Sequence, residues 1–129
     1  MTWYITVDMV YGAILRYYRK QAKLTQRSVC STYGVTNTVY SRYERGELPV
    51  PATFIFMLVK RFDKSYAEVA RHVVELERSL SQHEIHLLIA PPVDETFIVV
   101  RQSVIDSLIK YARSILTIKL KSEGRKNAK

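Results

Sequence analysis

The stretch LTQRSVCSTYGVTNTVYSRYERG, residues 24–46, decides how the first half of the chain folds. Its apolar residues recur at helical spacing, while Thr25 and Thr36 stand where two short helices would begin. Gly34 lies between them and can adopt the left-handed backbone conformation that a sharp turn between helices requires. The stretch therefore predicts two short helices joined by a tight turn.

Helical patterns continue on both sides of this stretch. Before it, Asp8 is the predicted N-cap of a helix that runs to about Ala22. After it, Gly46 stops the second short helix, and Pro51 suits the first turn of a further helix through ATFIFMLVKRF. We therefore predict a helical domain over residues 1–64, built from four or five short helices.

Composition restricts the classes of protein to which the chain can belong. It has 129 residues, of which 47% are hydrophobic and 25% are charged, the balance of a globular protein. No apolar run is long enough to cross a bilayer and no signal peptide is recognised, so we expect a cytoplasmic protein. Cys30 is the single cysteine, which excludes an internal disulfide and a cysteine-based zinc site.

Positive charge is concentrated in the first half of the chain. The formal net charge of the whole sequence is +8. Residues 1–65 hold ten Lys and Arg against four Asp and Glu, a net of +6, whereas residues 66–129 hold ten against eight, a net of +2. A basic half indicates a polyanionic partner, either nucleic acid or an anionic membrane surface.

The spacing within residues 24–46 favours nucleic acid, so no membrane partner is expected. A helix that enters the DNA major groove needs short polar side chains at its N-terminal end and another helix that braces it from behind. The pattern LTQ-x-x-apolar-small-x-x-x-G-V-[ST]-x-x-x-apolar-S-R-x-E-x-G is met here without insertion or deletion. On these residues the chain resembles the lambda-repressor-like, Cro/CI-type helix-turn-helix transcription regulators, over about residues 11–74.

The resemblance and the chemistry of the side chains predict how double-stranded DNA is bound. Asn can pair with adenine, Arg with guanine, and Thr or Val can touch a thymine methyl group. The predicted base-reading residues are Asn37, Thr38, Val39, Ser41 and Arg42. The predicted phosphate-binding residues are Lys23, Gln26, Arg27, Thr36 and Arg45, of which Gln26 matches the phosphate-clamping glutamine of the family. The resemblance also pairs Arg19 with Glu44 in an internal ion pair, which we expect to be structural.

The second half of the chain predicts an association region. Apolar side chains step by three and four residues from Tyr66 to Leu87, a heptad-like seam on one long helix. The prolines at 91–92 end that helix, and Asp94 would cap a last helix whose apolar face is wide. A competing interpretation makes IHLLI and FIVV, within residues 85–100, a pair of strands, because both runs are rich in branched residues and flank a turn.

These features predict an all-α fold of a helix-turn-helix domain followed by a helical hairpin. Residues 65–121 would form the hairpin and dimerise the protein, and residues 122–129 would be a basic flexible tail. The predicted dimer contacts are Val73, Leu76, Leu80, Leu87, Val104, Leu108 and Ile115.

We therefore expect a sequence-specific DNA-binding repressor that acts as a homodimer on a near-palindromic operator. No enzymatic activity and no cofactor is expected. His83 and His86 lie three apart on the predicted helix, a spacing that can chelate a metal ion, but a third ligand is missing and no metal site is predicted. Two alternatives stay open: an antitoxin or phage-type switch protein whose second half binds a partner protein, and an adaptor that has kept the fold but lost DNA binding.

Overall fold

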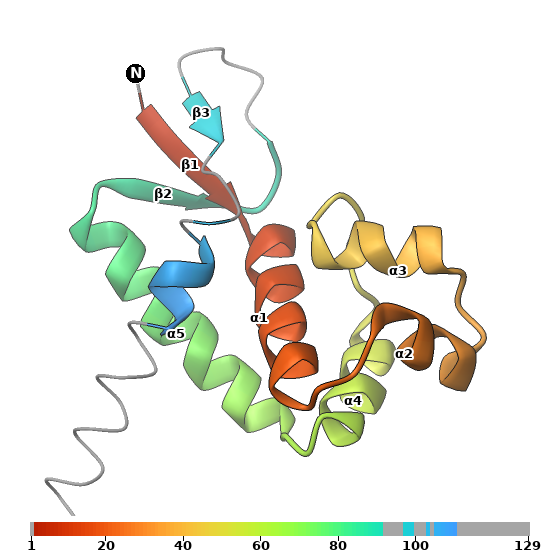
Figure 1. Cartoon of the computed structure of the whole chain (residues 1–129). Helices are drawn as coiled ribbons and strands as arrows, with labels where there is room; N and C mark the ends of the chain where they lie inside the picture. Colours follow the sequence, from red (N-terminus) through yellow and green to blue (C-terminus); the bar gives the residue numbers. More distant parts are fainter. Residues whose placement is uncertain (1, 92–96, 100–102, 104, 111–129) are drawn as a thin grey trace, which may run out of the picture.

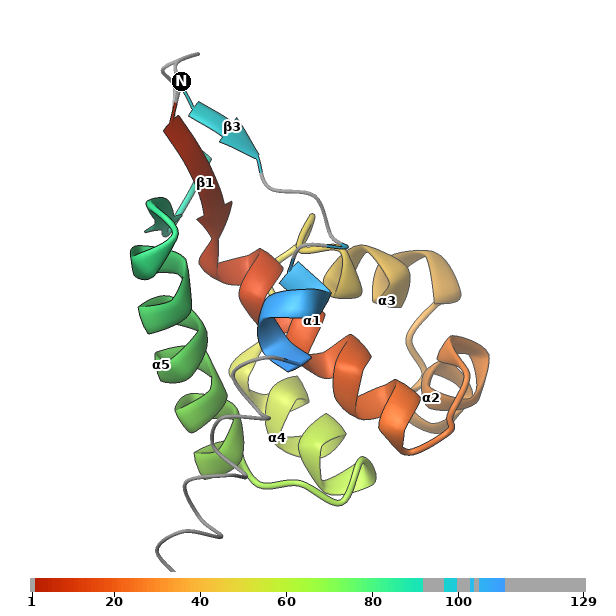
Figure 2. The same cartoon turned by 60° about the vertical axis from the view of Figure 1, so that its left-hand side comes forward.

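The computed structural model describes residues 2–91, 97–99, 103 and 105–110 (Figure 1). Helix α1 lies at the centre, with α5 on one side and α2 and α3 on the other (Figure 1, Figure 2). Among the described residues, no helix is both long enough and apolar enough to cross a membrane. The elements, in chain order, are β1 (Thr2–Thr6), α1 (Val7–Gln21), α2 (Gln26–Tyr33), α3 (Asn37–Glu44), α4 (Ala52–Arg61), α5 (Tyr66–Gln82), β2 (Ile85–Leu88) and β3 (Phe97–Val99).

Helix α1 begins directly after the strand β1. Thr6 is its N-cap, because its backbone is extended and its Oγ1 accepts a hydrogen bond from the backbone N–H of Met9 at 3.2 Å. The prediction that Asp8 caps this helix is wrong. Asp8 lies in the first turn, where its carboxylate is next to the positive end of the helix dipole. The helix starts earlier than predicted because TWYIT was not recognised as a strand that leads straight into it.

The two short helices and their turn are confirmed. Thr25 caps α2 by accepting a hydrogen bond from Ser28 N at 3.1 Å, and Thr36 caps α3 by accepting one from Val39 N at 3.3 Å. Gly34 ends α2 with a φ of 66°, the left-handed conformation that the sequence predicted. The local sequence was sufficient here because caps and a turn glycine act within a few residues of the helix ends.

The prediction of one long helix through Leu87 is wrong. Helix α5 ends at Gln82, His83 is its C-cap, and Glu84 has a left-handed φ of 57°. The chain then enters β2, whose isoleucine and leucines lie on a pleated, half-buried surface. The competing prediction of strands in IHLLI and FIVV is therefore confirmed for β2 and β3.

These two strands do not pair with each other, as a simple strand pair would. Strand β1 lies between them in the order β2-β1-β3, and both neighbours run parallel to it. In this register Trp3 is opposite Ile85 on one side and Ile98 on the other. Parallel strands need long connections, and here β1 is joined to β2 through the five helices α1 to α5. The all-α prediction is wrong because the N-terminal strand finds its partners far along the chain.

One hydrophobic core runs through both halves of the protein. Ile5 on β1, Leu15 on α1, Val69 and Leu80 on α5, and Ile105 are all fully buried in it. Residues 105–110 are helical and lie across α1 on the side of α5 (Figure 1, Figure 2). The boundary predicted at residue 64 stays a prediction, but the described core crosses it.

The described residues of the predicted dimer seam face this core. Leu76, Leu80 and Leu108 are buried within the single chain, and Val73 and Leu87 are half-buried against the same core. They fill the interior because β2 and residues 105–110 fold back onto α1 and α5. A dimer interface built from them stays a prediction, with little surface left at the three leucines. The remaining predicted elements, namely Asp94, Val104, Ile115 and the basic tail, lie outside the described residues.

Candidate nucleic-acid interface

Helix α3 is held close to α1 at Gly12. A Cβ atom added to Gly12 would lie 2.3 Å from the backbone oxygen of Tyr43 and 2.6 Å from that of Glu44, so only glycine fits at this crossing. The sequence analysis did not single out Gly12. The available signal was a glycine inside an apolar helical pattern, a position that costs about 1 kcal/mol relative to alanine unless packing requires it.

A buried ion pair joins the same two helices. The guanidinium of Arg19 donates from Nε to Glu44 Oε2 at 2.7 Å and from Nη2 to Glu44 Oε1 at 3.0 Å, which confirms the predicted pair. The side chains are 10% and 2% exposed. Burial acts to lower the pKa of Arg19, but the hydrogen bonds and charge of Glu44 oppose it, and the pKa is raised above its usual value. The charge of Arg19 is therefore fixed, and α3 is anchored to α1 at its last turn.

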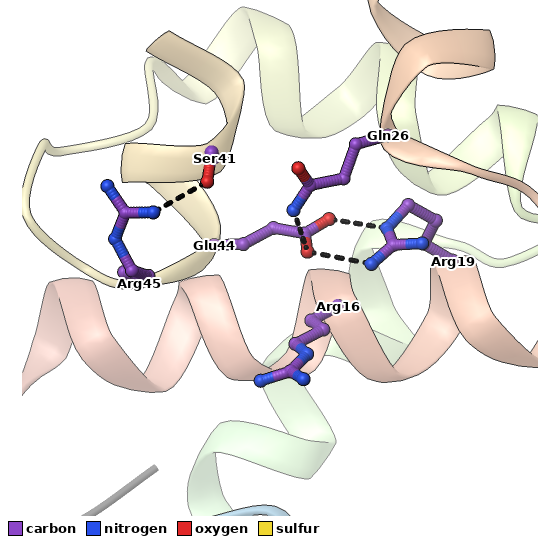
Figure 3. A pocket seen from close by; sticks show the side chains of 6 residues that line it. All are labelled: Arg16, Arg19, Gln26, Ser41, Glu44 and Arg45. Carbon is purple, nitrogen blue, oxygen red and sulfur yellow. Dashed lines mark hydrogen bonds and ion pairs between the residues drawn. The ribbon is translucent and has the colours of Figure 1, made fainter. Parts of the chain in front are cut away.

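Gln26, the predicted phosphate clamp, completes this group (Figure 3). Its Nε2 donates a hydrogen bond to Glu44 Oε1 at 3.0 Å, and the residue is half-buried at the start of α2. A primary amide has a second N–H, so this bond orients Gln26 without using all of its donors. Its role toward phosphate stays a prediction.

The outer side of α3 is polar and open. Asn37, Thr38 and Arg42 are exposed, and Val39 and Ser41 are half-buried. Positions 37, 38, 41 and 42 fall on one side of a helix, because residues four apart are neighbours on its surface. Within the described part of the chain, Asn37, Thr38 and Arg42 are therefore accessible to a ligand.

Comparison with known families identifies this arrangement. A helix-turn-helix family profile, HTH_3, matches residues 15–69. Residues 15–69 are a Cro/CI-type helix-turn-helix domain. No curated protein and no solved structure matches the chain.

The Cro/CI-type domain is the DNA-binding part of transcription regulators, a class that is typically non-enzymatic. The match runs from the second half of α1 into the start of α5 and contains α2, α3 and α4 entirely. It leaves out β1, β2, β3 and residues 105–110, so it assigns no function to the sheet or to most of α5.

Within the Cro/CI-type domain, Glu47 contacts two of the predicted DNA-binding arginines. Its Oε1 accepts a hydrogen bond from Arg45 Nε at 2.9 Å, and its Oε2 accepts one from Arg45 Nη2 at 3.2 Å and one from Arg42 Nε at 3.3 Å. These bonds, first those from Arg45, lower the pKa of Glu47, while the hydrogen bond to Glu47 raises the pKa of Arg45. Glu47 was not among the predicted site residues, because the motif that carries the resemblance ends at Gly46.

The predicted phosphate-binding residues differ in exposure and in the hydrogen bonds that they already make within the protein. Lys23, Arg27 and Thr36 are exposed, and the Thr36 hydroxyl also caps α3. Arg45, by contrast, donates from Nη1 to Ser41 Oγ at 2.7 Å in addition to its bonds with Glu47. Three of its nitrogens are therefore engaged within the protein, and a phosphate would have to compete for them.

A polar hollow of about 240 Å³ opens between α1, α2 and α3 (Figure 3). The Glu44 carboxylate lies between Gln26 and Arg19, while Arg45 is turned the other way, toward Ser41 (Figure 3). The hollow is cationic, because Glu44 is the single carboxylate among its six lining residues. These are Arg16, Arg19, Gln26, Ser41, Glu44 and Arg45.

Cys30 on α2 and Tyr40 on α3 are both buried. Burial, and then the nearby Glu44 carboxylate, raise the pKa of the Cys30 thiol and that of the Tyr40 phenol. Both side chains therefore stay neutral at physiological pH. Cys30 Sγ approaches the backbone oxygen of Thr36 at 3.8 Å, so the small cysteine lies where α2 meets the start of α3.

The two histidines considered as metal ligands do not share a helix. His83 is the C-cap of α5, and its Nδ1 lies 2.8 Å from the backbone oxygen of Ser79. His86 is on β2. The expected three-residue spacing along one helix is therefore wrong, because α5 ends before either histidine.

Proposed function

We propose that this protein is a sequence-specific repressor that binds double-stranded DNA as a homodimer on a near-palindromic operator. The observation that carries the proposal is the open polar side of α3 in a Cro/CI-type domain. Asn37, Thr38 and Arg42 are exposed on this helix, the one that such domains direct toward DNA. DNA binding follows from the domain. Repression, the dimer and the operator are the proposed parts.

The side chains on α3 suit direct reading of bases in the major groove. Asn37 can pair with adenine through two hydrogen bonds, and Arg42 can do the same with guanine. Thr38 and Val39 can contact a thymine methyl group, and Ser41 can bond to either kind of base edge. Exposed Lys23 and Arg27, with Gln26 and Thr36 at the starts of α2 and α3, would bind phosphates and fix the orientation of the domain.

A homodimer is proposed on energetic grounds. One helix-turn-helix domain offers few base contacts, and two recognition helices about 34 Å apart would read two successive major grooves. Occupying a promoter in this way would repress transcription. No effector is needed for this mechanism.

The test begins with selection of bound sequences from random duplex DNA. We expect a near-palindromic consensus and a mobility shift in which two chains bind one duplex, with sedimentation measuring the free oligomer. Failure to bind any duplex at low salt would contradict DNA binding. A consensus with a single half-site and a monomer on DNA would contradict the homodimer alone.

A second candidate function is an antitoxin or phage-type switch, in which DNA binding serves autoregulation. It is favoured by large apolar side chains left uncovered around the sheet: Ile89 is 87% exposed and Trp3 is 46% exposed. A partner protein could cover them. A stable, stoichiometric partner that co-purifies with the protein and increases operator affinity would favour this candidate over a simple repressor.

A further inference from the structure

Glu47 lies in the turn that follows α3 and connects two arginines on the DNA-facing side. Its backbone N–H donates to the carbonyl oxygen of Arg42 at 2.9 Å, which fixes the turn against the helix. Its carboxylate then accepts two hydrogen bonds from Arg45 and one from Arg42. Charge-assisted bonds with a bidentate arginine have a defined geometry, so the carboxylate is oriented by Arg45.

The two arginines use Glu47 in different ways. Arg45 bonds through Nε and Nη2 to Glu47 and through Nη1 to Ser41, so its guanidinium is occupied inside the protein. Arg42 bonds through Nε alone. Among the described residues, nothing accepts a hydrogen bond from its Nη1 or Nη2. These are the two nitrogens with which an arginine bonds to O6 and N7 of guanine.

We propose that Glu47 is a positioning residue for DNA recognition: it holds Arg42 by Nε and directs the free end of the guanidinium toward a base edge. The chain Ser41–Arg45–Glu47–Arg42 orients the reading arginine before DNA arrives. Pre-organisation reduces the rotamer entropy that a long side chain loses on binding. This inference rests on the DNA-binding function proposed above.

The carboxylate also has a sequence-independent effect on affinity. Glu47 places a negative charge beside two positive charges, so the turn presents less net charge to phosphates than two free arginines would. Non-specific binding depends mainly on phosphate neutralisation by lysine and arginine. Glu47 therefore weakens phosphate binding to operator and random DNA alike, while it favours the side-chain geometry needed for the operator.

The test compares Glu47→Gln with the wild type and with Glu75→Gln. Glu75 lies half-buried on α5 and pairs with exposed Arg78 at 3.6 Å, so its substitution removes the same charge from another ion pair, away from α3. Affinities are measured for the selected operator and for a random duplex across a range of salt concentrations, and thermal unfolding is followed for each variant.

We expect Glu47→Gln to strengthen random-duplex binding by about 2–10-fold and to steepen the dependence of log affinity on log salt by about 0.9. The operator-to-random affinity ratio should fall by about tenfold, part of the value of one bidentate base contact. Glu75→Gln should leave the ratio unchanged. Since Glu47 is exposed, Glu47→Gln should keep a melting temperature close to that of the wild type.

The double variant Arg42→Ala/Glu47→Gln shows whether Glu47 acts through Arg42. If Glu47 acts by positioning Arg42, its substitution has no further effect on the affinity ratio once Arg42 is alanine. An unchanged ratio for Glu47→Gln alone would overturn the inference. The inference would also be overturned if adding Glu47→Gln to Arg42→Ala lowered the affinity ratio as much as Glu47→Gln does alone. Glu47 would then contact a base itself. Absence of wild-type binding to any duplex would instead contradict the proposed function.

Discussion

Arg19 on α1 and Glu44 at the end of α3, 25 positions apart, form a bidentate ion pair that is almost closed to solvent. The bond from Gln26 to the same carboxylate adds the start of α2 to the group. Helices α1, α2 and α3 therefore meet at one negative charge. A buried charge of this kind is costly when its partner is lost, because neither water nor another cation replaces it.

Glu44→Gln should destabilise the protein by about 3–5 kcal/mol, the usual cost of removing one partner of a buried pair. The amide keeps the shape of the side chain but leaves the Arg19 charge without compensation. Urea unfolding followed by circular dichroism measures the change. Glu77→Gln, an exposed position on α5, is the matched control and should shift stability by less than about 0.5 kcal/mol. Equal stabilities for the two variants would contradict the structural role of the pair.

Gly12→Ala should separate α1 from α3. The added Cβ would lie 2.3 Å from the Tyr43 carbonyl oxygen, and backbone atoms cannot yield as a flexible side chain can. We expect a loss of about 1–3 kcal/mol, as for other overpacked positions, despite the higher helix propensity of alanine. Thermal unfolding checks this result.

Gly34→Ala provides the comparison for that experiment. Nothing lies within 4 Å of a Cβ added there, but its φ is 66°. Gly34→Ala should lower the free energy of unfolding by about 1 kcal/mol through backbone strain alone. Gly34→Asn should therefore recover part of the loss, because asparagine adopts the left-handed conformation more readily. A Gly12→Ala protein that is as stable as the wild type would show that the two helices can move apart without loss.

The helix-turn-helix could be predicted well because its sequence signals are local. Thr25, Gly34 and Thr36 act on backbone groups within four residues, and the apolar spacing around them is helical. The Arg19–Glu44 pair came from the family resemblance, which carries information on distant contacts that local patterns lack. The fold of residues 15–69 therefore follows from the amino-acid sequence together with that resemblance.

The prediction for the second half of the chain failed because its structure depends on contacts that are distant in sequence. A step of three and four residues continues from α5 into IHLL, so periodicity alone cannot show that the helix stops at Gln82. Strand β1 is short, and its partners lie beyond five helices, so no local signal links them. Glu47 was missed because its role depends on where the side chains of Arg42 and Arg45 point in the folded protein.

Ile5→Ala tests the unexpected sheet. Ile5 is fully buried on the central strand β1, where its side chain joins the core shared by both halves of the chain. Truncation should cost about 2–5 kcal/mol, as for other isoleucines removed from cores. Val74→Ala, at an exposed position of α5, should change stability by less than about 0.5 kcal/mol. If both changes are small in urea unfolding, the sheet adds little to the core.

Tyr40→Phe should make the protein more resistant to alkali. Burial and the Glu44 carboxylate raise the pKa of Tyr40, so the folded protein keeps this phenol neutral while the unfolded chain ionises it near pH 10. A raised folded-state pKa leaves stability constant below the unfolded value and reduces it above, by about 1.4 kcal/mol per pH unit. Ionisation of Cys30 in the unfolded chain, from about pH 8.5 upward, lowers the stability of the fold in the same direction.

Unfolding free energies at pH 7 and pH 10.5 distinguish the outcomes. Among the described residues the Tyr40 hydroxyl makes no well-oriented hydrogen bond, so Tyr40→Phe should cost less than about 1 kcal/mol at pH 7. At pH 10.5 it should lose less stability than the wild type does. Tyr33→Phe, on α2, serves as the control. An identical pH dependence for wild type and Tyr40→Phe would exclude Tyr40 as the titrating group.

Arg42→Ala and Arg27→Ala should weaken DNA binding in different ways. Within the described part of the chain nothing bonds to Nη1 or Nη2 of Arg42, so its loss should reduce the operator-to-random affinity ratio by about 10–100-fold. Asn37→Ala should do the same at a different base pair.

Arg27, exposed on α2, should bind phosphate. Its loss should weaken binding to all duplexes equally and reduce the slope of log affinity against log salt by about one. Arg71→Ala, at an exposed position of α5, is the control and should change neither the affinity ratio nor the salt slope. An Arg42→Ala protein that discriminates between sequences as well as the wild type would show that Arg42 does not read a base.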